Sequence, residues 1–558
     1  MNVKGHVVDV MRHEIFDGEV VVEGENIVEV KRCQLPASEQ PWPYLMPGFI
    51  DSHVHIESSM MVPREFARVA VCHGTIGVMA DPHEIGNVMG IEGIDFMIRS
   101  GRQVRFNFCF GAPSCVPAVG GDIETSGATL DAKDTAMLMA RSDIGFLSEV
   151  MNYQGVLAGD KEVMAKIEAA RRHGKPVDGH APRLTGRQRH QYASAGITTD
   201  HECSTLEEGR SCIHAGMKVM IREGSAAKDY ELLNPLIRER PDMVMFCTDD
   251  CHPDDLVRGH INLIVKRALA DGHNLWDVLQ AACVNAQRHY GQRWGLLQAG
   301  DPATFIIVDN LSPHFRVERT FIRGTEVYNH NAGIAHDALI ESNEGDGEWP
   351  NRFVAEPVAV GDLAIDLRPG KTMHVIQASE GSLLTRHDEV TLTGDPHTDS
   401  RYPWAEAQKI VVYNRYQPGA RPVVALVRGF GIECGAIASS VAHDCHNIVA
   451  IGSNDEYLVR AINRVVEMRG GMVAAGPEET VDIPLPIAGL MAPLSGSEMA
   501  CLTLRIHEMA KRIGCPMKSP FIAMAFMCLP VIPDIKITDR HLVDTRNMRI
   551  IKDLAPSC

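Results

Sequence analysis

The sequence has no long apolar run and no paired-cysteine motif. No stretch approaches the roughly 20 uncharged apolar residues that a membrane-spanning helix needs, and the first residues, MNVKGHVVDVMRHEIFDGEV, carry charges throughout and have no apolar signal core. The 15 cysteines are scattered over 558 residues and none forms a CxxC pair. An odd number of dispersed cysteines argues against a disulfide framework. We therefore expect a cytoplasmic protein without a membrane partner.

Positive charge is in the minority. The chain has 54 Lys and Arg against 72 Asp and Glu, a formal net charge of -18. Such a surface repels phosphate backbones, so nucleic acid is not an expected partner, whereas a small neutral substrate is compatible with it. The 45% hydrophobic and 23% charged residues are ordinary for a globular protein. The length exceeds what one core usually serves, which predicts two or three domains.

Short β-rich runs occur at two distant places in the chain. GHVVDV and GEVVVEGENIVEV lie in residues 1–47, and ATFIIVDN and ERTFIRGTEVYN lie in residues 290–330. Because these runs flank a long middle segment, we predict one small composite β-sandwich domain. Beyond it, residues 331–354 are acidic and rich in Gly and Asn, which is typical of a linker, and residues 355–558 have the mixed pattern of a further α/β domain.

Residues 48–289 alternate short apolar runs with amphipathic stretches such as DKEVMAKIEAARRHG. The apolar runs are FIDSHVHI, IGVMAD, FNFCFGAP, IGFLSEV, PVDGH, ITTDH, KVMIREG and MVMFCTDD. Strand-plus-helix units repeated in this way predict an α/β fold of the (β/α)₈ barrel type. A doubly wound open sheet is the alternative, but no GxGxxG follows the first strand.

Polar residues end almost every apolar run of this segment. They are His53, His55, Asp81, Glu149, His180, His201 and Asp249. The functional groups of a barrel collect at the carboxyl ends of its strands. The first two histidines are two residues apart on an expected strand, so their imidazoles point the same way and can bind one ion. A single buried histidine is more often structural, but the whole set is hard to explain without a metal.

This arrangement resembles the amidohydrolase superfamily. PGFIDSHVH, followed by His180, His201 and Asp249 at the ends of the fifth, sixth and eighth strands, carries the resemblance. GLLQAGDPATFIIVD resembles the closing signature of that superfamily, with Thr304 where Asp is usual. The strings SHVHIESSM, MADPHEIGNVMG, GHAPRLTG, DHEC and CTDDCHPDDL resemble the adenine deaminase family, and ASSVAHDCHNIVAIG is similar to its appended C-terminal domain.

The resemblance implies two divalent metal ions per chain. His53, His55 and Asp249 would hold one ion and His180 and His201 the other, with Glu149 bridging them where many amidohydrolases carry a carboxylated lysine. Imidazole and carboxylate ligands without thiolate suit Mn, Fe(II) or Zn. The family favours Mn or Fe(II), with Zn as a further option.

The implied reaction is the hydrolytic deamination of adenine to hypoxanthine and ammonia. It needs a hydroxide, a proton shuttle and a donor to the ring nitrogen. We expect Asp249 to be both ligand and shuttle, and Asp250 to orient the substrate. Glu149 completes the expected catalytic set.

The ring-nitrogen donor is less directly indicated. Related deaminases carry a Glu three residues after the fifth-strand histidine, where this chain has Arg183. The segment DPHEI offers His83 and Glu84, of which we favour Glu84 as the donor and both as substrate contacts. The alternative is that they only cap the following helix. REGS supplies a second candidate region, with Arg222, Glu223 and Ser225 as its polar residues.

A further cluster lies in the expected C-terminal domain. His443, Asp444 and His446 have a spacing that could bind a metal, but such a cluster is more often a hydrogen-bonded loop. We expect it to support the site or a domain interface. We also expect a homo-oligomer.

Two other functions compete with adenine deamination. An amidohydrolase acting on a cyclic amide or on another 6-substituted purine is the first, although enzymes for cyclic amides generally carry the bridging lysine and lack this C-terminal domain. A non-catalytic barrel scaffold is the second, although scaffolds of that kind lose several ligands, whereas every expected position is filled here.

Overall fold

The computed structural model describes residues 1–342, 347–365, 370–391 and 407–551. Parts of the expected linker and C-terminal domain (343–346, 366–369, 392–406 and 552–558) lie outside these described residues. The chain divides into two compact units. The first contains Met1–Pro82, Phe96–Ser114 and Asp131–Gly347, and the second contains His83–Asp95, Cys115–Leu130 and Glu348–Cys558.

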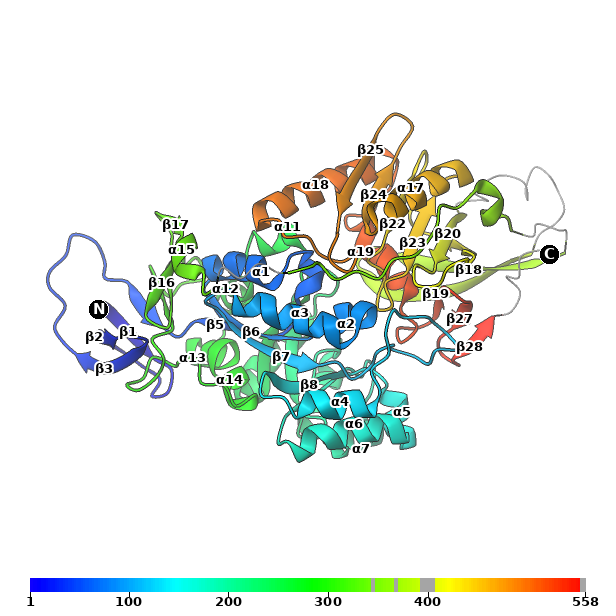
Figure 1. Ribbon diagram of the computed structural model, residues 1–558. Coiled ribbons are helices and arrows are strands. Elements are labelled where there is room, and N and C mark those ends of the chain that lie inside the picture. The colour runs from blue at the N-terminus through cyan, green and yellow to red at the C-terminus, as the bar shows by residue number, and fades with distance from the viewer. Residues whose placement is uncertain (343–346, 366–369, 392–406, 552–558) are drawn as a thin grey trace. The chain divides into compact units, whose positions relative to one another are not determined.

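Parallel strands form the centre of the first unit (Figure 1). They are β5 (Phe49–His55), β6 (Thr75–Ala80), β7 (Asn107–Ala112), β8 (Ile144–Val150), β9 (Val177–Gly179), β10 (Thr199–Asp200), β11 (Lys218–Arg222) and β12 (Val244–Cys247). The short β13 (Asp249–Asp250) follows β12 and pairs in parallel with β5. Between β9 and β10, the Thr198 N–H donates to the Val177 carbonyl at 2.9 Å. The strands follow one another around the unit in chain order, and the last of them, β13, pairs with the first, β5. This arrangement confirms the predicted barrel-type α/β fold.

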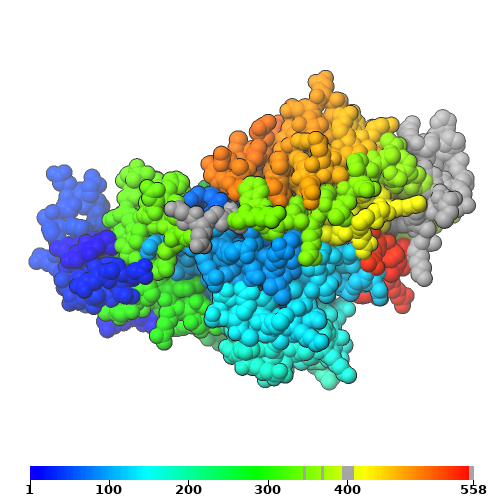
Figure 2. Space-filling model, viewed as in Figure 1, coloured from blue at the N-terminus to red at the C-terminus, as the bar shows by residue number. Residues whose placement is uncertain are grey.

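The barrel strands are buried because both of their faces are covered. Every residue of β5, β6 and β12 is buried, as expected of parallel strands under helices. The outer helices α4 (Ala132–Met139) and α6 (Lys161–Arg172) pack against each other and against β8. In the space-filling view, the cyan segment that carries them forms a continuous outer surface (Figure 2). Asp160 caps the start of helix α6, where its carboxylate accepts the Glu162 and Val163 N–H groups.

Both predicted β-rich segments enter one eight-stranded sheet of the first unit. Its order is β17 (Gly333–Ile334), β16 (Thr325–Asn329), β15 (Val317–Ile322), β14 (Phe305–Val308), β4 (Tyr44–Met46), β1 (Asn2–Asp9), β2 (Glu14–Glu23) and β3 (Asn26–Arg32). Strands β14 and β4 join the two segments in antiparallel fashion, with Ile306 opposite Met46. The Thr304 hydroxyl accepts the Arg323 N–H at 3.1 Å, so this departure from the family signature has a structural role.

A second eight-stranded sheet forms the centre of the second unit. Its order is β19 (Ser382–Thr391), β18 (Thr372–Ser379), β21 (Val423–Arg428), β20 (Ala407–Tyr413), β23 (Ile448–Gly452), β22 (Ala436–Ser439), β24 (Gly471–Ala475) and β25 (Thr480–Pro484). Helix α17 (Asp455–Met468) packs against β22, β23 and β24 (Figure 1), and it buries Leu458, Ile462 and Val465 in their core. The additional α/β domain predicted for the C-terminal region is therefore present.

Two early parts of the chain belong to this second unit. Helix α2 (His83–Met89) is buried along its whole length, and its Asn87 carbonyl accepts the Ala128 N–H at 3.0 Å. The Thr125 N–H in turn donates to the Asp539 carboxylate at 2.8 Å. The predicted residues His83 and Glu84 therefore lie in the same unit as His443 and His446.

None of the helices in the described part of the chain has the length and apolar character required to cross a membrane.

Candidate metal centre

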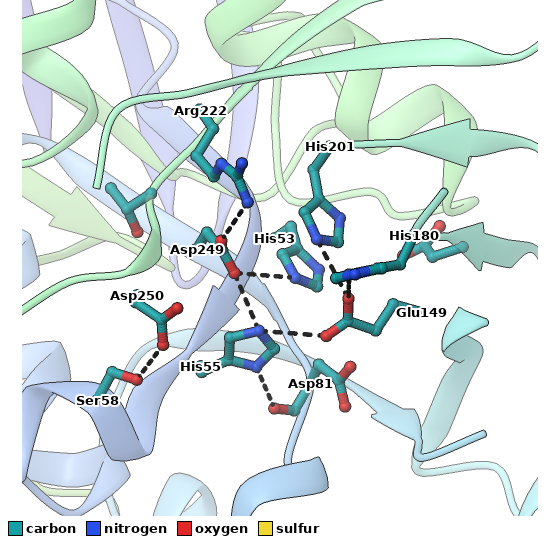
Figure 3. Close-up of polar contacts among 12 residues, drawn as sticks. His53, His55, Ser58, Asp81, Glu149, His180, His201, Arg222, Asp249 and Asp250 are labelled. Carbon is teal, nitrogen blue, oxygen red and sulfur yellow. Dashed lines mark hydrogen bonds and ion pairs between the residues drawn. The ribbon is translucent and has the colours of Figure 1, made fainter. Parts of the chain in front are cut away.

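The barrel strands bring the six predicted ligands into one buried cluster (Figure 3). The first two come from β5, and another ends β8. Two histidines directly follow β9 and β10, and the last ligand begins β13. In that order the residues are His53, His55, Glu149, His180, His201 and Asp249. Residues far apart in the sequence meet here because each lies near or just beyond the carboxyl end of a parallel strand.

Glu149 presents its two carboxylate oxygens to different histidines. Its Oε1 lies 3.4 Å from Nε2 of His55. Its Oε2 lies 2.6 Å from Nδ1 of His180 and 3.1 Å from Nε2 of His201. Burial opposes ionisation, but the two latter histidines hold the pKa of Glu149 well below its usual range. An ionised carboxylate in this orientation can bridge two cations.

Asp249 divides its oxygens in a similar way. Oδ1 lies 3.0 Å from Nε2 of His55 and 3.5 Å from Nε2 of His53, whereas Oδ2 accepts a hydrogen bond of 2.9 Å from Arg222. The backbone of Asp249 is left-handed, with φ of 59°. Aspartate tolerates this conformation better than most residues. The turn between β12 and β13 therefore aims this carboxylate into the cluster.

The hydrogen bonding of His55 fits a cation in the cluster. Its Nδ1 lies 3.2 Å from the Asp81 carbonyl oxygen. A carbonyl can only accept, so Nδ1 carries the proton and Nε2 of the neutral ring carries a lone pair. In the neutral ring that lone pair faces oxygens of both Asp249 and Glu149, a repulsion that either a cation between them or protonation of the ring removes. A carbonyl that fixes the tautomer of a histidine in this way is usual around metal ligands.

His53 supports the same interpretation. It is fully buried, its Nδ1 has no hydrogen-bond partner among the described residues, and its Nε2 lies 3.5 Å from Oδ1 of Asp249. Its ring stacks on that of His201, with centroids 4.1 Å apart. Buried imidazoles are normally hydrogen-bonded. The nitrogen and oxygen donors of this cluster, without thiolate, fit a divalent metal.

Glu202 is a functional candidate that the sequence analysis missed. Its Oε1 lies 3.6 Å from Nε2 of His201 and 3.9 Å from Nδ1 of His180. It also forms a close ion pair with Nη1 of Arg222. The available signal was its position directly after a predicted ligand in DHEC.

The predicted substrate residues of REGS have different surroundings. Arg222 reaches the cluster, where its guanidinium contacts Glu202 and Asp249. Ser225 instead donates to Asp255 at 2.6 Å. Glu223 accepts the Tyr230 N–H and pairs with Arg267. As substrate contacts, Arg222 and Ser225 remain predictions.

Asp250 follows the predicted ligand Asp249 on β13. Its Oδ1 accepts a hydrogen bond of 2.5 Å from the Ser58 hydroxyl, and both side chains are buried (Figure 3). This bond fixes the orientation of a carboxylate next to Asp249, as a substrate-orienting residue requires.

Glu84 belongs to a second buried cluster, in the second unit. Its Oε1 lies 2.6 Å from Nδ1 of His443, and its Oε2 forms a close contact with Nε2 of His446. Nε2 of His83 lies 3.5 Å from Oε1 of Glu84 and 3.7 Å from Oδ2 of Asp444. Burial opposes ionisation, but His443 and His446 hold the pKa of Glu84 well below its usual range. Glu84 is therefore a carboxylate, and any proton that it donates must first come from a neighbouring group.

Comparison with known proteins gives two family matches. A model of the amidohydrolase family matches residues 44–327, and a model of the adenine deaminase C-terminal domain matches residues 382–549. Adenine deaminase from Salinibacter ruber is 46% identical over 544 residues, which cover 97% of each chain. Adenine deaminases from Borreliella burgdorferi, over 551 residues and 97% of each chain, and from Methanosarcina mazei, over 567 residues and 98% of each chain, are each 41% identical.

Proposed function

The chain belongs to the adenine deaminase family of amidohydrolases, and from this premise we propose that it hydrolyses adenine to hypoxanthine and ammonia. Relatives that share the family name match it over nearly their whole length. The observation that carries the proposal is Glu149, whose Oε1 faces His55 and whose Oε2 faces His180 and His201.

We assign two divalent metal ions to the cluster. His53, His55 and Asp249 would hold one ion, His180 and His201 the other, and Glu149 would bridge them. Mn or Fe(II) is the expected metal, with Zn as an alternative. When bound, such ions supply a nucleophile by lowering the pKa of water. The orientation of Glu149 and the lone pair on His55 support this assignment.

Asp249 is the proposed proton shuttle. Arg222 holds its Oδ2, which leaves Oδ1 on the side of the histidines. A carboxylate fixed in this way can accept a proton from water and deliver it to the leaving amine. The neighbouring Asp250, held by Ser58, would orient the purine.

Glu84 and His83 are the proposed source of the ring-nitrogen proton and contacts to the substrate. This assignment rests on their place in DPHEI after β6. Because Glu84 is ionised, its proton would have to come from a paired imidazole, and His443 contacts it at 2.6 Å. Proton donation to the ring makes the carbon that carries the amine more susceptible to attack.

An ultraviolet assay of the purified, Mn²⁺-supplied protein tests the function. We expect adenine to be converted to hypoxanthine with release of ammonia, and adenosine to react poorly because Arg183 replaces the glutamate of adenosine deaminases. Adenosine turnover that equals or exceeds adenine turnover would contradict the proposal. So would activity on a cyclic amide such as dihydroorotate without activity on adenine.

We further propose that the enzyme is cytoplasmic and forms a homo-oligomer, with adenine as its small-molecule partner. The cysteines of the described part of the chain form no disulfide, which supports a reducing compartment. Light scattering coupled to size-exclusion chromatography would measure the number of subunits directly.

A further inference from the structure

The metal cluster contains one carboxylate more than the six predicted ligands require. Glu202 follows His201 directly, and its side chain is 11% exposed. Its Oε1 lies 3.6 Å from the His201 nitrogen and 3.9 Å from the His180 nitrogen that also contact Glu149. Ligand bonds of about 2.1 Å in a tetrahedral site place the ligand atoms about 3.4 Å apart. Glu202 therefore lies at a spacing suited to the same ion.

Arg222 fixes the position of this carboxylate. The Arg222 side chain is 5% exposed, and one of its terminal nitrogens, Nη1, contacts both Glu202 and Oδ2 of Asp249. Its Nε donates to Asp229 at 2.9 Å. The planar guanidinium holds several carboxylates in fixed directions at once. It thereby links Glu202, on the side of His180 and His201, to Asp249, on the side of His53 and His55.

A simple buried salt bridge does not account for Glu202. Arg222 already has two carboxylate partners, Asp229 and Asp249, for its single positive charge. Glu202, whose side chain is 11% exposed, is a third carboxylate on this guanidinium, and it adds desolvation cost and repulsion that another positive charge must offset. The side of Glu202 that faces His180 and His201 is where a cation would supply that charge.

We propose that Glu202 is a further carboxylate ligand of the ion held by His180 and His201, set in place by Arg222. This inference rests on the proposed function only in assuming that the cluster binds metal. It assigns Glu202 to one ion of the pair. Loss of the Glu202 charge should therefore lower the affinity for that ion and leave the affinity for the other ion unchanged.

The test measures Mn²⁺ binding to the full-length protein rather than activity. Parent and Glu202→Gln proteins are stripped with a chelator and titrated with Mn²⁺, and free Mn²⁺ is followed by electron paramagnetic resonance. We expect the variant to keep one ion at the affinity of the parent and to bind the second at least about tenfold more weakly, the scale seen when groups around a metal are altered. Arg222→Lys keeps the positive charge but loses the planar guanidinium. It should weaken binding of the second ion less than Glu202→Gln does.

Glu207→Gln is the matched control, because Glu207 lies five residues further along on α8 (Leu206–His214) and is exposed. This variant should bind two ions as the parent does. Two ions bound by Glu202→Gln at parental affinity would overturn the proposal, even if its activity fell, because Glu202 would then act on the substrate. A parent that never holds more than one ion would also overturn it.

If Glu202→Gln does not fold, anomalous scattering from crystals of the Mn²⁺-loaded parent decides the question. We expect an oxygen of Glu202 at about 2.0–2.4 Å from the ion beside His180 and His201. A separation well beyond bonding distance would refute direct ligation. Failure of the proposed function is a distinct result. If the parent binds two ions, one of them through Glu202, but does not deaminate adenine, the inference about Glu202 holds and the proposed activity is wrong.

Discussion

Two buried clusters of this protein use the same residue types, one in each unit. In the first unit, Glu149 lies among the barrel histidines, and in the second, Glu84 lies between His443 and His446. In both clusters each carboxylate oxygen contacts an imidazole. The difference lies on the opposite side of the rings, where the backbone determines which nitrogen carries the proton.

In the Glu84 cluster, Nδ1 of His446 accepts the Ala442 N–H at 3.2 Å. Nε2 of the neutral ring therefore carries the proton and donates it to Glu84, and this contact needs no cation. In the Glu149 cluster, Nδ1 of His55 faces the Asp81 carbonyl and leaves a lone pair on Nε2. A backbone donor thus fits a hydrogen-bonded network, and a backbone acceptor leaves the opposite nitrogen of a neutral ring suited to bind a metal. This agrees with interpreting HDCH as a hydrogen-bonded loop.

The largest effect is expected from removing the charge of Glu149. Glu149→Gln keeps the shape of the side chain, but two divalent cations a few ångströms apart then repel each other without a bridging anion. We expect metal content to fall from about two ions per chain toward one and deamination to be abolished. Elemental analysis beside the parent measures this, with circular dichroism as the folding control. If Glu149→Gln still bound two ions per chain, Glu149 would not be the bridging ligand.

Asp249→Asn should be the next most damaging change. Asparagine keeps an oxygen ligand but cannot carry the proton, so turnover should fall by about 10²–10⁴-fold while most of the metal remains bound. Steady-state kinetics and metal analysis of the same preparation check both parts. A variant within a few-fold of the parent would show that Asp250 or another group moves the proton.

The barrel, and the meeting of the proposed ligand residues at one end of it, could be predicted because their signal is local. Each apolar run ends in a polar residue, and parallel strands bring those ends together whatever their separation in the sequence. The run IGFLSEV was enough to place Glu149 beside histidines from other strands. Asp249 was predicted in the same way.

The surroundings of Glu84 could not be predicted, because they depend on long-range packing. His443 is 359 residues away in the sequence, and no periodicity in DPHEI or HDCH indicates that they meet. Glu202 was missed for a related reason. A charged residue after a ligand is usually solvated, and only its partner Arg222, from the next strand, shows that it is held inward.

A smaller effect, on stability rather than on metal, is expected from His446→Asn. The shorter amide cannot reach Glu84, and loss of a hydrogen bond to a charged group costs about 1.5–3 kcal/mol of unfolding free energy. Metal content should not change, and the destabilisation should persist in chelator. His446→Gln, whose amide can replace Nε2 as donor, is the matched rescue variant. Loss of metal in His446→Asn would mean that this cluster also binds an ion.

The pH dependence of that destabilisation follows from Glu84. Its pKa in the folded protein is lowered well below the unfolded value of 4.5 by His443 and His446, against the effect of burial. Such a group stabilises the fold fully above the unfolded pKa and loses this contribution as pH falls through the folded pKa. The difference between parent and His446→Asn should therefore be constant near neutral pH and shrink below about pH 4.5. Denaturant unfolding at several pH values measures it, and a difference that grows with acid would contradict the assignment.

The smallest effect is expected from Ser58→Ala. The Ser58 hydroxyl donates to Asp250 at 2.5 Å, so its loss frees a carboxylate proposed to orient the purine without touching a proposed metal ligand. We expect KM for adenine to rise by about three- to tenfold, since hydrogen bonds to charged groups contribute about 1.5–3 kcal/mol and part of this is recovered by solvation. The kcat should stay within about twofold of the parent, because positioning the substrate is separate from moving the proton. Ser59→Ala is the matched control, since that neighbouring hydroxyl donates to the Ile56 carbonyl instead. A fall in kcat at unchanged KM in Ser58→Ala would place Asp250, rather than Asp249 alone, in the proton transfer.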